Sequence, residues 1–109
     1  NVFWPGFESH PNHETAKSQM KDFGGMVSFS LKDESLDAAF QFLENTKVFT
    51  LAESLGGVES LVSHPVTMTH ASIPESERLK IGITDSLIRL SVGIEDIEDL
   101  LFDLKQALG

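Results

Sequence analysis

Strict alternation of hydrophobic and polar residues marks two parts of the chain, and this period of two predicts half-buried β-strands. Residues 26–31 and residues 87–92 both alternate in this way, and the second stretch sets Arg89 between Ile88 and Leu90. One face of that strand is expected to carry Ile88, Leu90 and Val92, and the other Leu87, Arg89 and Ser91. Shorter apolar stretches predict further strands at residues 2–4, 48–51 and 58–63.

A helical period of three to four residues marks the stretches between these strands. It predicts helices over residues 10–20, up to about residue 45, and over residues 74–82, with Asp33 or Ser35 as the cap of the second one. In that second helix the expected apolar face consists of Leu36, Phe40 and Leu43.

A last helix is predicted after Gly93, because an acidic segment that suits the positive end of a helix dipole is followed by regularly spaced apolar residues. Its expected buried residues are Ile97, Leu100, Leu101, Leu104 and Leu108. Together these elements predict a single α+β domain, with about four mainly antiparallel strands packed with helices.

Composition limits the function classes. With 109 residues, 40% of them hydrophobic, the chain is large enough for one domain with a modest core. The net charge of -9 argues against binding to nucleic acid or to anionic membrane surfaces. There is no membrane-spanning apolar run, no signal peptide and no cysteine, which fits a cytoplasmic protein.

The chain opens on the apolar segment V-F-W-P without an initiator methionine. A trimmed terminus would explain this, and so would excision from a larger protein. We expect the second, with Val2, Phe3 and Trp4 packing against the rest of that protein.

Arg89 is the most informative single residue, because a guanidinium inside an apolar strand needs a partner. Burying an unpaired charge costs on the order of several kcal/mol. The planar fork of arginine matches a carboxylate with two parallel hydrogen bonds. Arg89 is therefore interpreted either as a wet-face residue paired with a surface acid or as a residue that binds the carboxylate of a ligand.

The segment E-S-L-G-G at residues 53–57 is the second candidate site. Gly56 and Gly57 predict a turn with positive φ. The absence of side chains would also let a ligand approach the backbone, with Ser54 offering a hydroxyl and an amide and Glu53 accepting a hydrogen bond from an amino group. A plain turn and a ligand-contacting loop both remain open.

The remaining side chains add no catalytic set. His10 and His13 have a helical spacing that can hold zinc, but no third ligand is evident, so we assign no metal site. His64 and His70 are expected to be structural. The sequence has no nucleophile-elbow motif, phosphate-binding loop or dinucleotide fingerprint.

Several blocks of sequence, in order, resemble one enzyme family. They are P-G-F-E-S-H-P-N-H-E-T-A-K-S-Q-M at residues 5–20, F-G-G-M-V-S-F at 23–29, T-L-A-E-S-L-G-G-V-E-S-L at 50–61, S-H-P-V-T-M-T-H-A-S at 63–72 and G-I-T-D-S-L-I-R-L-S-V-G-I-E-D at 82–96. Together they resemble the C-terminal domain of the cystathionine gamma-lyase and gamma-synthase family, the pyridoxal-phosphate-dependent enzymes of cysteine and methionine metabolism.

The resemblance implies an aspartate-aminotransferase-like (fold type I) enzyme, of which residues 1–109 are the small C-terminal domain. An N-terminal domain, absent from this chain, would hold pyridoxal phosphate on a lysine, and the whole protein would be a homotetramer. None of the lysines in this chain lies in the family's cofactor-binding motif. The chain alone is therefore expected to contain no catalytic residue, to hold no cofactor covalently and to be inactive.

The resemblance also assigns roles to four residues. Arg89 matches the arginine that binds the α-carboxylate of the substrate. Ser54 matches a residue that lines the site near the cofactor and the carboxylate, and Leu55 is its neighbour. Glu53 matches a position that separates subgroups, where glutamate favours enzymes acting at the γ-carbon of cystathionine or of an activated homoserine.

These matches predict the substrate-binding domain of a trans-sulfuration enzyme, either cystathionine gamma-lyase or cystathionine gamma-synthase. The lyase converts cystathionine to cysteine, α-ketobutyrate and ammonia. Two alternatives remain. One is a stand-alone amino-acid-binding or regulatory module, in which Arg89 and Ser54 bind a carboxylate without chemistry. The other is a structural domain that supports the tetramer.

Overall fold

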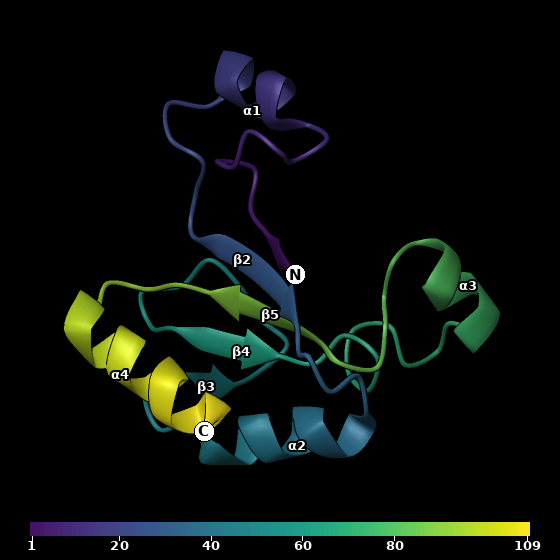
Figure 1. Cartoon of the computed structure of the whole chain (residues 1–109). Coiled ribbons are helices and arrows are strands. Elements are labelled where there is room, and N and C mark those ends of the chain that lie inside the picture. Colours follow the sequence, from purple (N-terminus) through teal and green to yellow (C-terminus); the bar gives the residue numbers. More distant parts are fainter.

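A five-stranded sheet forms the centre of the computed structural model, which describes residues 1–109 (Figure 1). Its strands lie in the order β1-β2-β5-β4-β3. They are β1 (Val2–Phe3), β2 (Met26–Ser30), β3 (Thr50–Leu51), β4 (Leu61–Ser63) and β5 (Leu87–Ser91). Only β3 and β4 pair in parallel, and the other neighbours are antiparallel. The predicted α+β class with mainly antiparallel strands is confirmed, with five strands rather than about four.

Helices cover one face of this sheet. The helices are α1 (His13–Gln19), α2 (Leu36–Asn45), α3 (Glu75–Lys80) and α4 (Ile97–Leu108). α2 and α4 pack against each other below the sheet, whereas α1 and α3 extend from it as separate lobes (Figure 1). No helix combines the length and the apolar character needed to cross a membrane. The buried core is formed by Ala39, Phe42, Phe49, Val62, Ile88, Leu90, Leu100 and Ala107.

Strand β5 has the two faces that the alternation predicts. Ile88 and Leu90 are 0% and 4% exposed and belong to the core between the sheet and the helices α2 and α4. Arg89 is half-buried and points to the opposite face, because successive side chains of a strand alternate. In the sheet register it lies between Ser28 of β2 and Ser63 of β4. This serine-rich face, without a helical cover, is where the candidate site lies.

The buried side of α2 differs from the prediction. Ala39 and Phe42 are its buried residues, whereas Leu36 and Phe40 are exposed and Leu43 is half-buried. The residues that face the sheet follow the helical period from Ala39 rather than from Leu36. Two capping predictions are confirmed. The Oγ atom of Ser35 accepts a hydrogen bond from the backbone N–H of Ala38, and Gly82 ends the third helical region with φ of +85°.

The buried side of α4 also differs. Only Leu100 of the expected residues is fully buried, and Leu104 is half-buried. The predicted burial of Ile97, Leu101 and Leu108 is wrong, because these residues are 60%, 52% and 57% exposed. The other buried residues of the helix are Asp103 and Ala107. The helix is thus turned so that a carboxylate, rather than a row of leucines, faces inward.

Asp103 is buried because it satisfies the backbone of the segment before β3. Its carboxylate accepts hydrogen bonds from the backbone N–H groups of Lys47, Val48 and Phe49 at 2.7, 2.9 and 2.9 Å. Gln106 donates a further hydrogen bond to it at 3.0 Å. These N–H groups are not available to a strand ladder, so β3 begins at residue 50 and not at residue 48 as predicted. Asp103 therefore joins α4 to the sheet.

Acid should weaken this junction. Burial raises the pKa of the Asp103 carboxyl, but the hydrogen bonds from Phe49, Lys47 and Val48 outweigh burial and hold the pKa below its ordinary value of 3.8. A carboxyl whose pKa is lower in the folded state contributes stability above its unfolded pKa and loses it as the pH falls through the folded pKa. Urea unfolding of the full-length protein should show the difference in unfolding free energy between wild type and Asp103→Asn shrinking below about pH 4. A difference that stays constant from pH 7 to pH 3 would contradict the lowered pKa.

The N-terminal lobe is held by aromatic packing. Trp4 packs edge-on against Phe7 and Phe23, and its indole N–H donates a hydrogen bond to the carbonyl of Gly24 at 3.1 Å. Trp4 therefore packs partly within the chain and is half-buried. Val2 and Phe3 of β1 remain 56% and 46% exposed.

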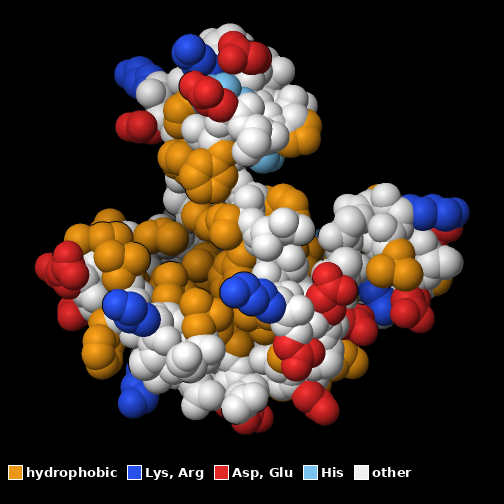
Figure 2. Space-filling model, in the orientation of Figure 1, with side chains coloured by type: hydrophobic (Ala, Val, Ile, Leu, Met, Phe, Trp, Pro, Cys, Tyr) orange, Lys and Arg blue, Asp and Glu red, His pale blue; other side chains and the backbone are white.

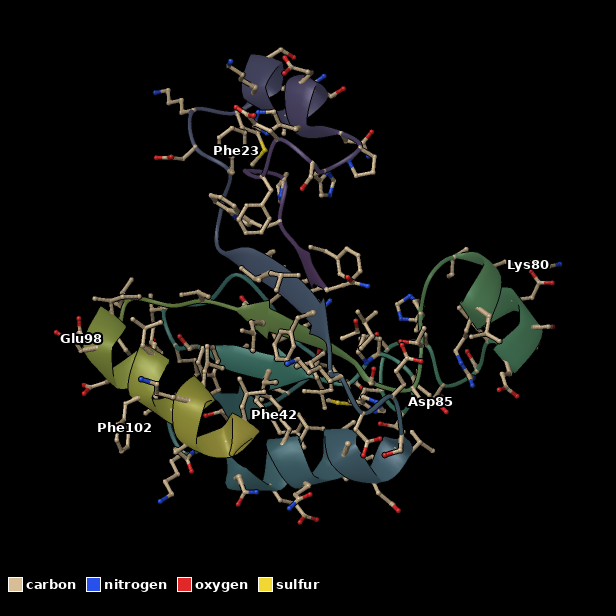
Figure 3. The ribbon with its side chains drawn as sticks, in the orientation of Figure 1. Phe23, Phe42, Lys80, Asp85, Glu98 and Phe102 are labelled. Atoms are coloured by element: carbon tan, nitrogen blue, oxygen red, sulfur yellow. The ribbon has the colours of Figure 1, made fainter.

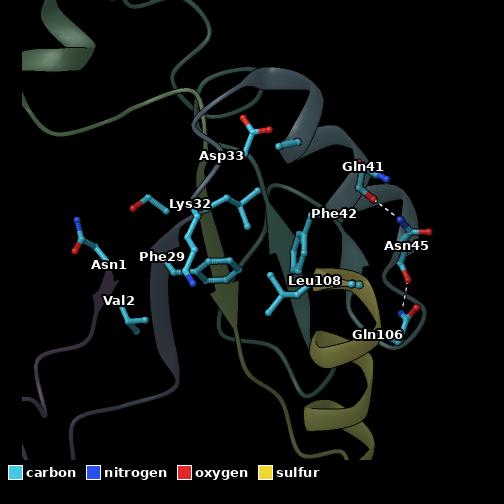
Figure 4. Close-up of a pocket in the computed structure, with 15 residues that line it drawn as sticks. Asn1, Val2, Phe29, Lys32, Asp33, Gln41, Phe42, Asn45, Gln106 and Leu108 are labelled. Carbon is cyan, nitrogen blue, oxygen red and sulfur yellow. Dashed lines mark hydrogen bonds between the residues drawn. The ribbon is translucent and has the colours of Figure 1, made fainter.

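The helix-covered face has an open hollow beside β2. Figure 2 shows an apolar surface across the middle of this face, bordered by charged side chains. In the close-up, Phe29, Phe42 and Leu108 point into the hollow, and Asn1 and Val2 lie at its edge (Figure 4). Two helices thus leave the β1–β2 side of a five-stranded sheet uncovered.

Candidate functional site

The connection between β3 and β4 brings the two candidate segments together. Because these neighbouring strands are parallel, residues 52–60 must return along the sheet before β4 can begin. This loop runs on the Arg89 side of β5. Its Glu53 carbonyl accepts a hydrogen bond from Arg89, and its Gly56 N–H donates one to Ser91.

Arg89 is half-buried, and most of the N–H donors of its guanidinium have no partner in the chain. Its Nη2 atom donates to the main-chain carbonyl of Glu53 at 3.0 Å. No carboxylate of the chain lies within 4.0 Å of its guanidinium, and the single ion pair of the structure joins Lys80 and Glu77 on α3. The interpretation of Arg89 as paired with a surface acid is therefore wrong. A guanidinium has five N–H donors, so those left over can bind a planar anion such as a carboxylate.

The side chains that were predicted to line the site point outward from the loop. Glu53, Ser54 and Leu55 are all exposed, with Leu55 at 55%. The main chain is the part of this segment that Arg89 contacts. The structure thus places the Glu53–Leu55 segment next to Arg89, with its three side chains free to meet something outside the chain.

Of the two adjacent glycines, only one has a backbone angle that other residues rarely adopt. Gly56 has φ of +76°, as predicted, whereas Gly57 does not have positive φ, so that part of the prediction is wrong. A side chain on either residue would meet no atom within 4 Å. Gly56 is required by its backbone angle, and the space over both residues is open.

The far end of the loop is held by a carboxylate. Glu95 accepts hydrogen bonds from the backbone N–H of Ser60 at 2.8 Å and from its hydroxyl at 2.7 Å. The same Ser60 oxygen accepts a hydrogen bond from the Gly93 N–H at 2.8 Å. These hydrogen bonds, first the one from the Ser60 backbone, hold the pKa of Glu95 below its ordinary value. Ser60 is used in this way and the Val58 carbonyl binds the Ile94 N–H, and β4 begins at residue 61 rather than at residue 58 as predicted.

Sequence reasoning missed Ser91, Ser60, Gly93 and Glu95. Within the acidic segment that predicted the start of α4, Asp96 caps the helix by accepting a hydrogen bond from the N–H of Glu98, whereas Glu95 binds Ser60. At Gly93 a Cβ atom would lie 2.2 Å from the Val58 carbonyl oxygen, so only glycine fits there. The one available signal was the alternation in β5, which placed Ser91 on the same face as Arg89.

The histidines have structural contacts. His64 is 0% exposed and is hydrogen-bonded to Thr67 Oγ1 at 2.8 Å and to the Asp85 carbonyl at 2.6 Å. His13 bonds to the Pro5 carbonyl at 2.7 Å and stacks on Phe23. No group of three or more histidine, aspartate or glutamate side chains is arranged to hold a metal ion.

Comparison with known proteins decides the family. The family model described as Cys/Met metabolism PLP-dependent enzyme matches residues 1–109, the whole of the chain.

The chain belongs to this family of pyridoxal-phosphate-dependent enzymes. Cystathionine gamma-lyase of Dictyostelium discoideum is 64% identical over 107 residues, and so is cystathionine beta-lyase of Lactococcus lactis subsp. cremoris (strain MG1363). These matches cover 98% of this chain but only 27% and 28% of the relatives. Among solved structures, cystathionine gamma synthase from Xanthomonas oryzae pv. oryzae in complex with cystathionine superposes with a TM-score of 0.92 at 50% identity, covering 99% of this chain and 28% of that one.

The residues present do not by themselves fit the family's cofactor. A lysine that carries pyridoxal phosphate as a Schiff base is activated by desolvation. All lysines of this chain are exposed: Lys17, Lys21, Lys32, Lys47, Lys80 and Lys105. No step of a reaction is therefore assigned to the cofactor on this chain.

Proposed function

We propose that this chain is the C-terminal, substrate-binding domain of a pyridoxal-phosphate-dependent trans-sulfuration enzyme that acts at the γ-carbon, a cystathionine gamma-lyase or gamma-synthase. The proposal includes a fold type I, homotetrameric, cytoplasmic protein whose N-terminal domain carries the cofactor. The observation that carries it is Arg89, a half-buried guanidinium without a carboxylate partner in a chain of net charge -9.

Arg89 would bind the α-carboxylate of the amino-acid substrate. Its position on a central strand of the sheet fixes the guanidinium, and its unused N–H donors suit the two oxygens of a carboxylate. Holding the carboxylate fixes the orientation of the bonds at Cα, which lowers the entropic cost of reaching the transition state. Ser54, with Leu55 beside it, would line the same site near the cofactor.

The open hollow supports the proposal that this chain is part of a larger protein. The chain covers only 27% to 28% of its curated relatives. Val2 of β1, at the edge of the hollow, and Leu108 of α4, which points into it, are 56% and 57% exposed, although a monomeric domain would normally bury such side chains. We propose that polypeptide of the same full-length protein covers this apolar surface.

The choice of the γ-carbon depends on Glu53. Relatives named gamma-lyase and beta-lyase are equally identical to the chain, at 64%, so overall similarity does not favour either. Glu53 is exposed in the loop beside Arg89, where it can accept a hydrogen bond from the amino group of the bound substrate. The proposed lyase would release cysteine, α-ketobutyrate and ammonia from cystathionine by γ-elimination, whereas β-elimination would release homocysteine, pyruvate and ammonia.

The proposal is tested by giving L-cystathionine to the full-length protein that contains this segment and identifying the keto acid released. α-Ketobutyrate is the expected product. Formation of cystathionine from cysteine and an activated homoserine would support the synthase instead. Pyruvate alone would contradict action at the γ-carbon. Binding of cystathionine with neither its cleavage nor its formation would contradict the enzyme and favour the stand-alone binding module.

Replacing Glu53 with valine in the full-length protein should lower the ratio of α-ketobutyrate to pyruvate by about tenfold, which corresponds to about 1.4 kcal/mol. Glu53 is exposed, so the fold should be unaffected. Glu59→Val is the matched control, an exposed glutamate of the same loop that should leave the ratio unchanged. If Glu53→Val keeps the wild-type ratio, Glu53 does not determine specificity.

A further inference from the structure

We infer that Ser91 is a positioning residue that fixes the Glu53–Leu55 segment over Arg89. This deepens the proposed function, on which its catalytic consequence rests. Ser91 is 3% exposed and cannot itself reach a substrate, but its Oγ atom accepts a hydrogen bond from the Gly56 backbone N–H at 2.8 Å.

The contact links two parts of the site through one strand. Ser91 and Arg89 are two residues apart on β5 and therefore share a face. Arg89 contacts the Glu53 carbonyl, and Ser91 contacts Gly56 just beyond the exposed segment. One rigid strand thereby sets both the place of the guanidinium and the place of the loop in front of it.

Packing does not hold this part of the loop. The positions where Gly56 and Gly57 would carry a side chain have no atom within 4 Å, and Glu53, Ser54 and Leu55 are exposed. Hydrogen bonds from β5 are therefore the main restraint on the segment. Of the two, only the Arg89 contact comes from a side chain that would also bind the ligand, whereas Ser91 serves the loop alone.

The far end of the loop is restrained independently of Ser91. Glu95 binds Ser60, and the Ile94 N–H donates to the Val58 carbonyl at 2.9 Å. Loss of the Ser91 hydroxyl should therefore release the Glu53–Gly57 segment while residues 58–60 stay in place. A local displacement of about 1 Å in a substrate-positioning segment can lower activity on the order of a hundredfold.

Ser86 provides a matched control. It precedes β5, is 0% exposed, and its hydroxyl has no hydrogen-bond partner. Changing either serine to alanine removes one buried hydroxyl, but only Ser91→Ala removes a contact to the loop. Ser91→Thr keeps a hydroxyl at the same position and serves as the rescue variant.

The test compares Ser91→Ala, Ser91→Thr and Ser86→Ala in the full-length protein by amide hydrogen exchange and by kcat/KM for cystathionine. Ser91→Ala should speed exchange in the peptide that contains Gly56 at least fivefold, leave residues 58–60 unchanged and lower kcat/KM about tenfold. Ser91→Thr should restore both quantities, and Ser86→Ala should match wild type. Equal exchange at Gly56 in Ser91→Ala and Ser86→Ala, or failure of threonine to restore it, would overturn the inference.

The two readouts separate this inference from the proposed function. Exchange at Gly56 reports the hydrogen bond whether or not the protein cleaves cystathionine. Faster exchange in a protein that neither cleaves nor forms cystathionine would uphold the positioning contact and contradict the proposed reaction. Normal exchange in an active enzyme with unchanged kcat/KM would contradict the positioning role alone.

Discussion

Replacing Arg89 with alanine in the full-length protein should lower kcat/KM for cystathionine at least tenfold, a loss of about 1.4 kcal/mol, mainly through a higher KM. Arg89 has no carboxylate partner within the chain, so its removal breaks no internal ion pair. The variant loses the hydrogen bond to the Glu53 carbonyl, so the loss should appear in kcat/KM far more than in the stability of the fold. Steady-state kinetics together with a thermal unfolding curve would separate the two effects.

Two further variants sharpen this test. Arg89→Lys keeps the charge but cannot form two parallel hydrogen bonds with a carboxylate, so it should recover only part of the loss. Arg78→Ala removes the other arginine, which donates to the Ile73 carbonyl in the α3 lobe at 2.7 Å, and should leave the kinetics unchanged. Wild-type kinetics for Arg89→Ala would contradict the assignment of Arg89 as the carboxylate-binding residue.

The second large effect is expected at Asp103. Asp103→Ala should lower the unfolding free energy of this domain by about 3 to 5 kcal/mol, because three backbone N–H groups lose a charged acceptor inside the protein. Asp103 is 1% exposed, so water cannot replace the carboxylate without opening the structure. Urea unfolding of the full-length protein measures the loss of unfolding free energy, with amide hydrogen exchange in residues 47–49 as the probe of this domain.

Asp99→Ala is the control for Asp103, since it removes an exposed aspartate from the same helix. It should change stability by no more than about 0.5 kcal/mol. A loss at Asp103 no larger than the loss at Asp99 would mean that the three N–H groups find other partners.

Local periodicity predicted much of the fold, and long-range polar contacts explain its errors. The alternation in β5 placed Ile88 and Leu90 in the core and Arg89 on the opposite face. This prediction was possible because successive side chains of a strand point to opposite faces of the sheet, so the local sequence shows which residues share a face. The face of α4 was wrong because Asp103 is buried by partners more than fifty residues away. A hydrophobic pattern treats such an aspartate as a surface residue.

The candidate site was predictable only in part for the same reason. Arg89 stands out as a charge inside an apolar strand, and its relation to Glu53 was implied by the family resemblance. The contact of Ser91 with Gly56 and that of Glu95 with Ser60 each join residues thirty-five positions apart. Nothing in the local sequence of either partner marks the other, so only the folded chain shows how the loop is held.

The hydrophobic pattern also did not predict the exposed apolar side chains on the outer side of α4. Figure 3 shows Phe42 pointing from α2 toward the sheet and Phe102 pointing away from it. Phe102 and Ile97 on α4 are 70% and 60% exposed. This outer surface of α4 is separate from the hollow beside β2, and it is likewise unusual for an isolated domain.

The most direct measurement is a crystal structure of the full-length protein with L-cystathionine bound. The account predicts both oxygens of the substrate α-carboxylate within about 3 Å of the Arg89 guanidinium, with the Glu53–Leu55 segment facing the same ligand. A structure in which the carboxylate binds elsewhere, while Arg89 still contacts only the Glu53 carbonyl, would contradict it.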